Sequence, residues 1–138
     1  PNVVERSIIF PPASRLGPLT ADDCPEGSLD GVRRLLIHSH VSDLPDEVWP
    51  SEFPYPSPDL IELLGRHGCL LIGLDSPSFD DLNSSTLDGH HALRRSGMVN
   101  LETLNLSGVP DGDYELVALP LKLDLACGSP VRAILRTL

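Results

Sequence analysis

The chain has 138 residues, the length of one ordinary domain, and its 41% hydrophobic content is enough to form a core. A formal charge of −10 without a local cluster of Lys and Arg argues against binding to nucleic acids or to anionic membranes. The three cysteines are widely spaced and show no CxxC pattern, which argues against disulfides or a structural zinc knot and favours a reducing cytoplasm. The sequence shows neither a secretory signal pattern nor an apolar stretch long enough to cross a bilayer.

The first part of the chain is predicted to hold two strands. Val3 to Phe10 is rich in β-branched and apolar residues and precedes two prolines, which is typical of a strand that ends there. Thr20 can cap a short turn before Pro25. Arg33 to Ser39 has a continuous apolar centre, which is typical of a buried strand.

Two histidines stand at the end of this second strand. His38 and His40 alternate with Ser39, so they can project from one face of the chain. They are either a metal-binding pair or one capping and one solvated imidazole, and the spacing leaves both interpretations open.

Val41 to Pro56 is dense in prolines and acids and is predicted to be a loop. Its aromatic residues Trp49, Phe53 and Tyr55 can line a pocket for a planar substrate, or they can simply pack on the core. We take these three residues as candidate substrate-pocket residues.

The clearest helix begins at Ser57 and Pro58, an N-cap residue and a first-turn proline, and ends at Gly68. The next run, Cys69 to Leu74, is entirely apolar, as expected for a strand covered on both faces. A helix followed at once by a buried strand indicates an α/β layer.

Asp75, Ser76 and Ser78 follow where that strand leaves the sheet, which is a common location of sites in α/β proteins. We expect Asp75 to be structural or to orient a metal ligand, fixing the loop through Ser76 and Ser78, and not to be a ligand itself.

A second predicted helix carries His90 and His91; Ser84 or Ser85 can cap it, and Gly97 can end it. Met98 to Leu106, which contains Glu102, is predicted to be extended. Imidazole and carboxylate are ordinary ligands of zinc, so His90 and Glu102 can share a metal ion. On spacing alone, a hydrogen-bonded structural histidine and a solvated glutamate are the commoner arrangement, so the spacing does not by itself establish a metal site.

The last part of the chain is predicted to form two strands. Turn chemistry at Val109 to Asp113 precedes a strand from Tyr114 to Leu121, in which Pro120 indicates an edge or a bulge. A further turn leads to a closing strand from Val131 to Leu135. The sequence shows no internal repeat and no domain linker.

Four stretches, read together, resemble the bacterial kynurenine formamidase (arylformamidase) family of the metal-dependent cyclase-like hydrolases. They are Gly73 to Ser78, His90 with Glu102, Tyr114 to Lys122, and Gly128 to Ala133. The resemblance runs from about Arg33 to the C-terminus. It implies an α/β protein with a swivelling β/β/α fold, a homodimer, and hydrolysis of N-formyl-L-kynurenine to L-kynurenine and formate in tryptophan degradation. It also implies two zinc ions, or manganese or another divalent metal, with His90 and Glu102 among the ligands; His91 is a neighbour.

The sequence departs from this family at its start. The family's other ligands, and the histidine proposed for acid/base work, lie in an N-terminal motif His-x-Gly-(Thr or Ala)-His-x-Asp-x-Pro-x-His, which this sequence does not contain. Pro1 to Phe10 resembles a point past that motif, and Cys127 stands where the family commonly has an acid. We therefore expect residues 1–138 to be a single domain, the C-terminal part of a hydrolase domain whose N-terminal portion is lacking. Such a piece is expected to be inactive alone and prone to association.

Three functions remain in competition. The first is a metal-dependent amidohydrolase acting on an arylformamide. The second is another amide hydrolase of the superfamily, such as an isatin-type hydrolase acting on a cyclic amide. The third is a truncated, non-catalytic relative that keeps the fold and a dimer interface. The upstream histidine motif in the complete reading frame would separate the third from the first two.

Overall fold

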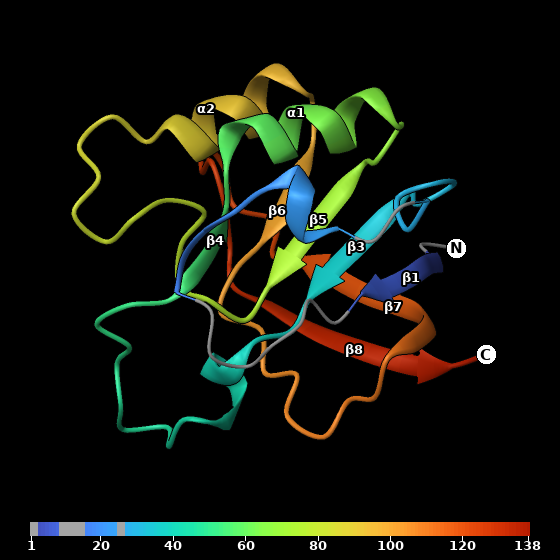
Figure 1. Ribbon diagram of the computed structural model, residues 1–138. Coiled ribbons are helices and arrows are strands. Elements are labelled where there is room, and N and C mark those ends of the chain that lie inside the picture. Colours follow the sequence, from blue (N-terminus) through green and yellow to red (C-terminus); the bar gives the residue numbers. More distant parts are fainter. Residues whose placement is uncertain (1–2, 9–15, 25–26) are drawn as a thin grey trace.

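The computed structural model describes residues 3–8, 16–24 and 27–138 of the chain. A central sheet has the strand order β6-β5-β3-β1-β7-β8 (Figure 1). Its strands are β1 (Val3–Ile8), β3 (Arg34–Ile37), β5 (Leu71–Leu74), β6 (Val99–Leu101), β7 (Gly112–Pro120) and β8 (Val131–Thr137). A small second sheet pairs β2 (Gly17–Leu19) with β4 (Pro54–Pro56) in parallel. The helices are η1 (Ala21–Asp23), η2 (His40–Asp43), α1 (Pro58–Arg66) and α2 (Asp88–Arg95).

The central sheet has a parallel half and an antiparallel half. Strands β1, β3, β5 and β6 run parallel to one another, whereas β7 runs antiparallel to both β1 and β8. Helices α1 and α2 lie side by side over one face of the sheet (Figure 1). Because the helices connect parallel strands, the parallel half is an α/β layer, as the sequence predicts.

The hydrophobic core lies between the two helices and the parallel strands. Helix α1 places Leu60, Ile61 and Leu64 on one buried face, and residues two apart in β5, Ile72 and Leu74, face the same core. Helix α1 begins as predicted: the Oγ of Ser57 accepts the Leu60 N–H at 3.2 Å, and proline occupies the first turn.

The other face of β5 is covered as well, as its apolar sequence predicts. A Cβ added to Gly73 would lie 2.6 Å from a methyl carbon of Leu36 and 2.9 Å from one of Leu104. The segment that follows β6 therefore packs on the second face of the sheet, and a side chain at position 73 would require these two leucines to shift.

The predicted edge position of Pro120 is confirmed by the strand pairing. Strand β1 pairs with β7 only between Gly112 and Glu115, so from Leu116 onward β7 has β8 as its only partner among the described residues. A proline that lacks an N–H is tolerated where one side of the strand is unpaired.

Several boundaries differ from the predictions. The predicted loop from Val41 to Pro56 contains η2 and β4, and Met98 to Leu106 is extended only over Val99–Leu101. Strand β2, which begins at Gly17, was not predicted, because three residues are too few to show a period. The predicted end of the first strand, at Phe10, lies outside the described residues. Within the described ranges, none of the helices has the length and apolar character needed to cross a membrane.

Candidate metal centre

The carboxyl ends of three parallel strands meet at one edge of the sheet, and each is followed by polar side chains. Ser39 follows β3, Asp75 follows β5 and Glu102 follows β6. In α/β proteins this edge is the usual place for a binding site, because the loops that leave it converge there. Asp75 and Glu102, two of the predicted site residues, therefore share one region of the fold.

Asp75 is 2% exposed and holds the loop after β3 in place. Its carboxylate accepts hydrogen bonds from the backbone N and Oγ of Ser39, both at 2.8 Å, and from the N and Oγ of Ser42, at 3.2 and 2.9 Å. The Oγ of Ser42 also accepts the Leu106 N–H at 2.9 Å. Asp75 thus ties loops at the ends of neighbouring strands together.

The predicted partners of Asp75 are wrong. The Oγ of Ser76 donates to the Pro54 carbonyl at 2.7 Å, which joins β5 to β4, and the Oγ of Ser78 accepts the Asp80 N–H at 3.1 Å. Because β3 and β5 are adjacent and parallel, the carboxylate after β5 meets the loop after β3 and not its own loop.

The structure leaves both interpretations of the His38 and His40 pair open. The Nδ1 atoms of both imidazoles are buried and lack hydrogen-bond partners in the described part of the chain. No group of three or more His, Cys, Asp or Glu side chains suited to a metal ion occurs among the described residues.

Asp80 takes the place of a missing N-cap at helix α2. The N-cap residue is Leu87, in the left-handed conformation at φ 52°, and it offers no side-chain acceptor. Instead, the Asp80 carboxylate accepts the N–H groups of Gly89 at 2.7 Å and His90 at 3.2 Å. A carboxylate at this position satisfies free N–H groups and interacts favourably with the helix dipole.

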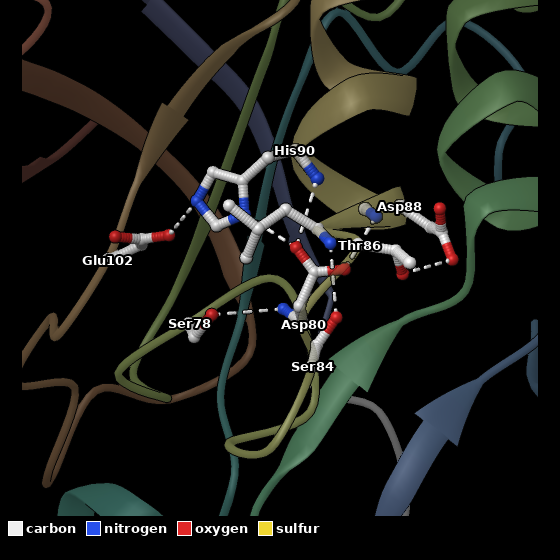
Figure 2. A network of polar contacts seen from close by, with 9 residues as sticks. Ser78, Asp80, Ser84, Thr86, Asp88, His90 and Glu102 are labelled. Carbon is white, nitrogen blue, oxygen red and sulfur yellow. Dashed lines mark hydrogen bonds and ion pairs between the residues drawn. The ribbon is translucent and has the colours of Figure 1, made fainter.

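The predicted capping by Ser84 or Ser85 is therefore wrong. The Oγ of Ser84 accepts the Leu87 N–H, at 3.1 Å, and so shapes the turn before the helix (Figure 2). The acceptor for the helix itself comes from Asp80, which is more distant in the sequence.

The same carboxylate contacts the imidazole of His90. Asp80 Oδ2 lies 2.6 Å from His90 Nδ1, and the Asp80 side chain is 7% exposed (Figure 2). Burial raises the pKa of Asp80, but the hydrogen bonds from the His90 ring and from the Gly89 and His90 amides together outweigh it, so the pKa lies below its ordinary value. Asp80 is therefore an ionised acceptor at neutral pH.

A glycine and an aromatic ring complete this arrangement. A Cβ added to Gly89 would lie 2.1 Å from the carbonyl oxygen of Phe79, so only glycine lets the helix start this close to the loop. The buried Phe79 ring lies edge-on to the His90 imidazole, with centroids 6.3 Å apart.

The predicted proximity of His90 and Glu102 is confirmed. His90 Nε2 lies 3.2 Å from Glu102 Oε1, on the side of the ring opposite Asp80 (Figure 2). Glu102 Oε1 is buried, and no hydrogen bond to it forms within the described residues, because the 3.2 Å contact lacks hydrogen-bond geometry. His91, the neighbour, is exposed.

The backbone after Glu102 is strained. Thr103 adopts φ 57°, which is unusual for a β-branched residue, and its N–H donates to the Ser76 carbonyl at 3.0 Å. The chain turns here and returns under β5, where the Leu104 N–H donates to the Leu74 carbonyl at 3.1 Å. This turn directs Glu102 toward His90.

These two side chains fit a divalent metal as part of its ligand set. An imidazole nitrogen beside a buried carboxylate oxygen without a hydrogen-bond donor is a suitable N and O pair for zinc. They fill two of the roughly four positions that zinc uses in proteins.

The aromatic residues proposed for a pocket separate into two groups. Phe53 and Tyr55 line a cavity of about 260 Å³, with ring centroids 6.3 Å apart in an edge-on arrangement. Trp49 is 66% exposed and does not line this cavity, so its role in a substrate pocket stays a prediction. The other lining residues are Leu16, Gly17, Ser51, Glu52, Asp81 and Leu82.

The pKa of Tyr55, a residue of the cavity wall, responds to the charge of Asp80. Burial raises the pKa of Tyr55, and the negative charges of Asp81 and Asp80 raise it further. Tyr55 is therefore a neutral donor at the wall of a cavity whose lining includes two carboxylates, Glu52 and Asp81.

Comparison with known proteins supports the resemblance seen in the sequence. Over 111 residues, which make up 80% of this chain and 53% of the relative, the sequence is 45% identical to the kynurenine formamidase of Maricaulis maris (strain MCS10). The chain thus spans about half the length of the curated relative it matches. No protein-family model matches the sequence.

Solved structures share the fold. A predicted metal-dependent hydrolase from Bacillus stearothermophilus gives a TM-score of 0.79 at 24% identity, covering 96% of this chain and 63% of that one. A potential metal-dependent hydrolase with cyclase activity gives 0.78 at 23% identity, covering 97% and 65%. An isatin hydrolase bound to the product analogue thioisatinate gives 0.59 at 27% identity, covering 72% and 43%. The predicted α/β fold of the cyclase-like hydrolases, the swivelling β/β/α fold, is confirmed.

Proposed function

We propose that this chain, a homologue of a bacterial kynurenine formamidase, supplies part of the active site of a metal-dependent amidohydrolase that converts N-formyl-L-kynurenine to L-kynurenine and formate. The observation that carries the proposal is the 3.2 Å approach of His90 Nε2 to Glu102 Oε1 at the carboxyl edge of the sheet. The 45% identity to the Maricaulis maris enzyme supports the choice of substrate.

The metal we propose is zinc, with two ions in the complete site. When bound, a divalent ion supplies Lewis acidity that activates water for attack on an amide. In this chain, His90 and Glu102 would hold it, and Asp80 would keep the His90 ring in place. We expect the remaining ligands and the acid/base histidine in the N-terminal motif of the family, which this sequence does not contain.

The 260 Å³ cavity beside Asp81 is our candidate for the aromatic part of the substrate. Phe53 and Tyr55 offer ring surfaces, and the carboxylates of Glu52 and Asp81 suit the ammonium group of an amino-acid substrate. A cyclic amide is the second candidate substrate, favoured by the similarity to the isatin hydrolase at 27% identity.

The first experiment measures zinc binding by the chain and by three variants. His90→Ala and Glu102→Ala should each abolish binding at this pair, because one remaining ligand cannot hold the ion against water. His91→Ala is the matched control, since this neighbouring imidazole is exposed, and it should bind zinc as the wild type does. Unchanged zinc stoichiometry in His90→Ala would refute the metal assignment.

The second experiment measures hydrolysis by the protein in the presence of a segment that carries the upstream histidine motif. Hydrolysis of N-formylkynurenine, with slow or no turnover of isatin, is expected. Turnover of isatin alone would select the cyclic-amide alternative, and turnover of neither substrate would select the non-catalytic relative.

We also propose that the protein forms a homodimer through the β7–β8 hairpin. Val117 pairs with Ile134 in register, so the two side chains share a face with Leu119, and all three are exposed. Contiguous exposed apolar side chains favour association. Leu119→Lys should shift the sedimentation of the protein toward the monomer, whereas Val48→Lys, at an exposed apolar position in another loop, should not. Identical sedimentation of wild type and Leu119→Lys would exclude this surface.

A further inference from the structure

The two nitrogens of the His90 imidazole face carboxylates in unequal ways. Nδ1 lies 2.6 Å from Asp80 Oδ2 and forms a hydrogen bond, whereas Nε2 lies 3.2 Å from Glu102 Oε1 without hydrogen-bond geometry. A neutral imidazole carries one N–H, and a short, well-directed contact to an ionised acceptor stabilises that proton more than a longer, poorly directed one.

Asp80 is itself held firmly. Its Oδ1 accepts the Gly89 N–H at 2.7 Å, its Oδ2 also accepts the His90 N–H at 3.2 Å, and its own N–H donates to Ser78 Oγ at 3.1 Å. These contacts fix both carboxylate oxygens relative to the first turn of α2, from which the His90 side chain departs (Figure 2). The Asp80 carboxylate is therefore tied to the turn that carries His90.

We propose that Asp80 is a positioning residue that fixes neutral His90 as its Nδ1–H tautomer and leaves the Nε2 lone pair free beside Glu102. The lone pair would then be available to a metal held jointly with Glu102. Histidine ligands of metals commonly donate their second N–H to a carboxylate, which sets the ring orientation and raises the basicity of the ligand. The consequence for metal affinity rests on the proposed function, whereas the tautomer of the metal-free protein does not.

The first test is the tautomer of His90 in the metal-free protein. Long-range ¹H–¹⁵N correlation spectra distinguish the two tautomers at a pH where the imidazole nitrogen shifts no longer change, and comparison with His90→Gln assigns the signals. The Nδ1–H form is expected in the wild type. Predominance of the Nε2–H form in the wild type would overturn the proposal, whatever any variant does.

The second test replaces the acceptor by a group of the same shape. In Asp80→Asn an amide N–H can face His90 Nδ1, so the ring proton should move to Nε2. Asp88→Asn is the matched control, because Asp88 is an exposed acid in the same first helical turn and its carboxylate accepts from Thr86 Oγ1 at 2.9 Å. It removes the same charge from the helix N-terminus, and the tautomer should stay Nδ1–H.

The third readout is zinc affinity, measured by competition with a chromogenic chelator. Asp80→Asn should weaken zinc binding about 10- to 100-fold, as the loss of such a partner does elsewhere, while Asp88→Asn should stay within about twofold. An Asp80→Asn protein with a folded amide spectrum, an Nδ1–H tautomer and wild-type affinity would overturn the proposal. If wild-type protein binds no zinc even with the segment that carries the upstream histidine motif, the proposed function fails, while the tautomer measurements still decide the role of Asp80.

Discussion

Two buried aspartates, Asp75 and Asp80, stand close together in the sequence and differ in what their carboxylates hold. Asp75 is 2% exposed and accepts four hydrogen bonds, all from Ser39 and Ser42. Asp80 is 5% exposed and accepts from the first turn of α2 and from an imidazole. The Oγ of Ser42 makes a further hydrogen bond only to the loop backbone at Leu106. The imidazole of His90, in contrast, has a second nitrogen that faces Glu102. Burial and hydrogen bonding alone therefore do not separate a structural carboxylate from one that serves a site; the chemistry of the partner does.

The largest expected effect is the loss of folding stability when Asp75 is replaced by asparagine. In Asp75→Asn an amide NH₂ group faces N–H and O–H donors whose hydrogen bonds the carboxylate had accepted. Because donors then face donors, the free energy of unfolding should fall by about 2–4 kcal/mol. The His90 tautomer and the zinc affinity should stay unchanged, because Asp75 does not contact His90 in any of its hydrogen bonds. Urea denaturation measures the free energy of unfolding, and competition with a chelator measures the zinc affinity.

The control for this experiment is Asp43→Asn, which removes the charge of an exposed acid from the same loop. It should change the free energy of unfolding by less than about 0.5 kcal/mol. A loss of zinc affinity in Asp75→Asn as deep as in His90→Ala would mean that Asp75 belongs to the site, and the contrast between the two aspartates would fail.

The next largest effect is expected at Gly89, where the backbone of α2 lies close to the Phe79 carbonyl. A substitution there tests whether this close approach supports the contacts of Asp80. In Gly89→Ala the new methyl group would meet the Phe79 carbonyl, at 2.1 Å for an unrelaxed Cβ, so helix and loop must separate. We expect a loss of about 1–3 kcal/mol in the free energy of unfolding, as for overpacking of a core. Zinc affinity should fall as well, because the separation lengthens the contact between Asp80 and His90.

Gly128→Ala is the matched control, since a Cβ at Gly128 meets no atom within 4 Å and its φ is not positive. Its free energy of unfolding and its zinc affinity should both equal those of the wild type. Wild-type stability and affinity in Gly89→Ala would show that the loop adjusts without cost and that the close approach does not position His90.

Local signals in the sequence predict the scaffold of this site well. Helix α1 follows from Ser57, Pro58 and one apolar face, and β5 follows from its apolar run, because each signal lies within the element it specifies. The pairing of His90 with Glu102 came from the resemblance, since spacing alone favoured a structural histidine and a solvated glutamate.

Asp80 was missed because its role depends on contacts between segments. Helix α2 starts at a leucine in the left-handed conformation, so the serines that precede it, the expected caps, do not reach the helix N–H groups. The available signal was an acid in a serine-rich loop ahead of a helix without its own cap. The partners of Asp75 were missed for the same reason, because strand order places its carboxylate against the loop after β3.

The smallest expected effect concerns Tyr55, which lies where the cavity approaches the Asp80 network. Burial is the largest cause of its raised pKa, followed by the charges of Asp81 and Asp80. Asp81→Asn removes the larger of the two charge effects, so the pKa of Tyr55 should fall part of the way toward its ordinary value of about 10. The absorbance of the phenolate in a Tyr114→Phe background, where Tyr55 is the only tyrosine, measures this pKa.

The sign of the pH dependence follows from the same shift. Because folding raises the pKa of Tyr55, its contribution to stability is fully present below the pKa of the unfolded chain, about 10, and is lost as pH rises through the higher folded value. Asp81→Asn should narrow the pH range between the unfolded and the folded pKa of Tyr55. Asp46 is an exposed acid that does not line the cavity, so Asp46→Asn should leave the titration of Tyr55 unchanged. Equal Tyr55 titrations in Asp81→Asn and Asp46→Asn would show that the Asp81 charge does not reach the cavity wall. The proposed recognition of a substrate ammonium group at Asp81 would then lose its electrostatic support.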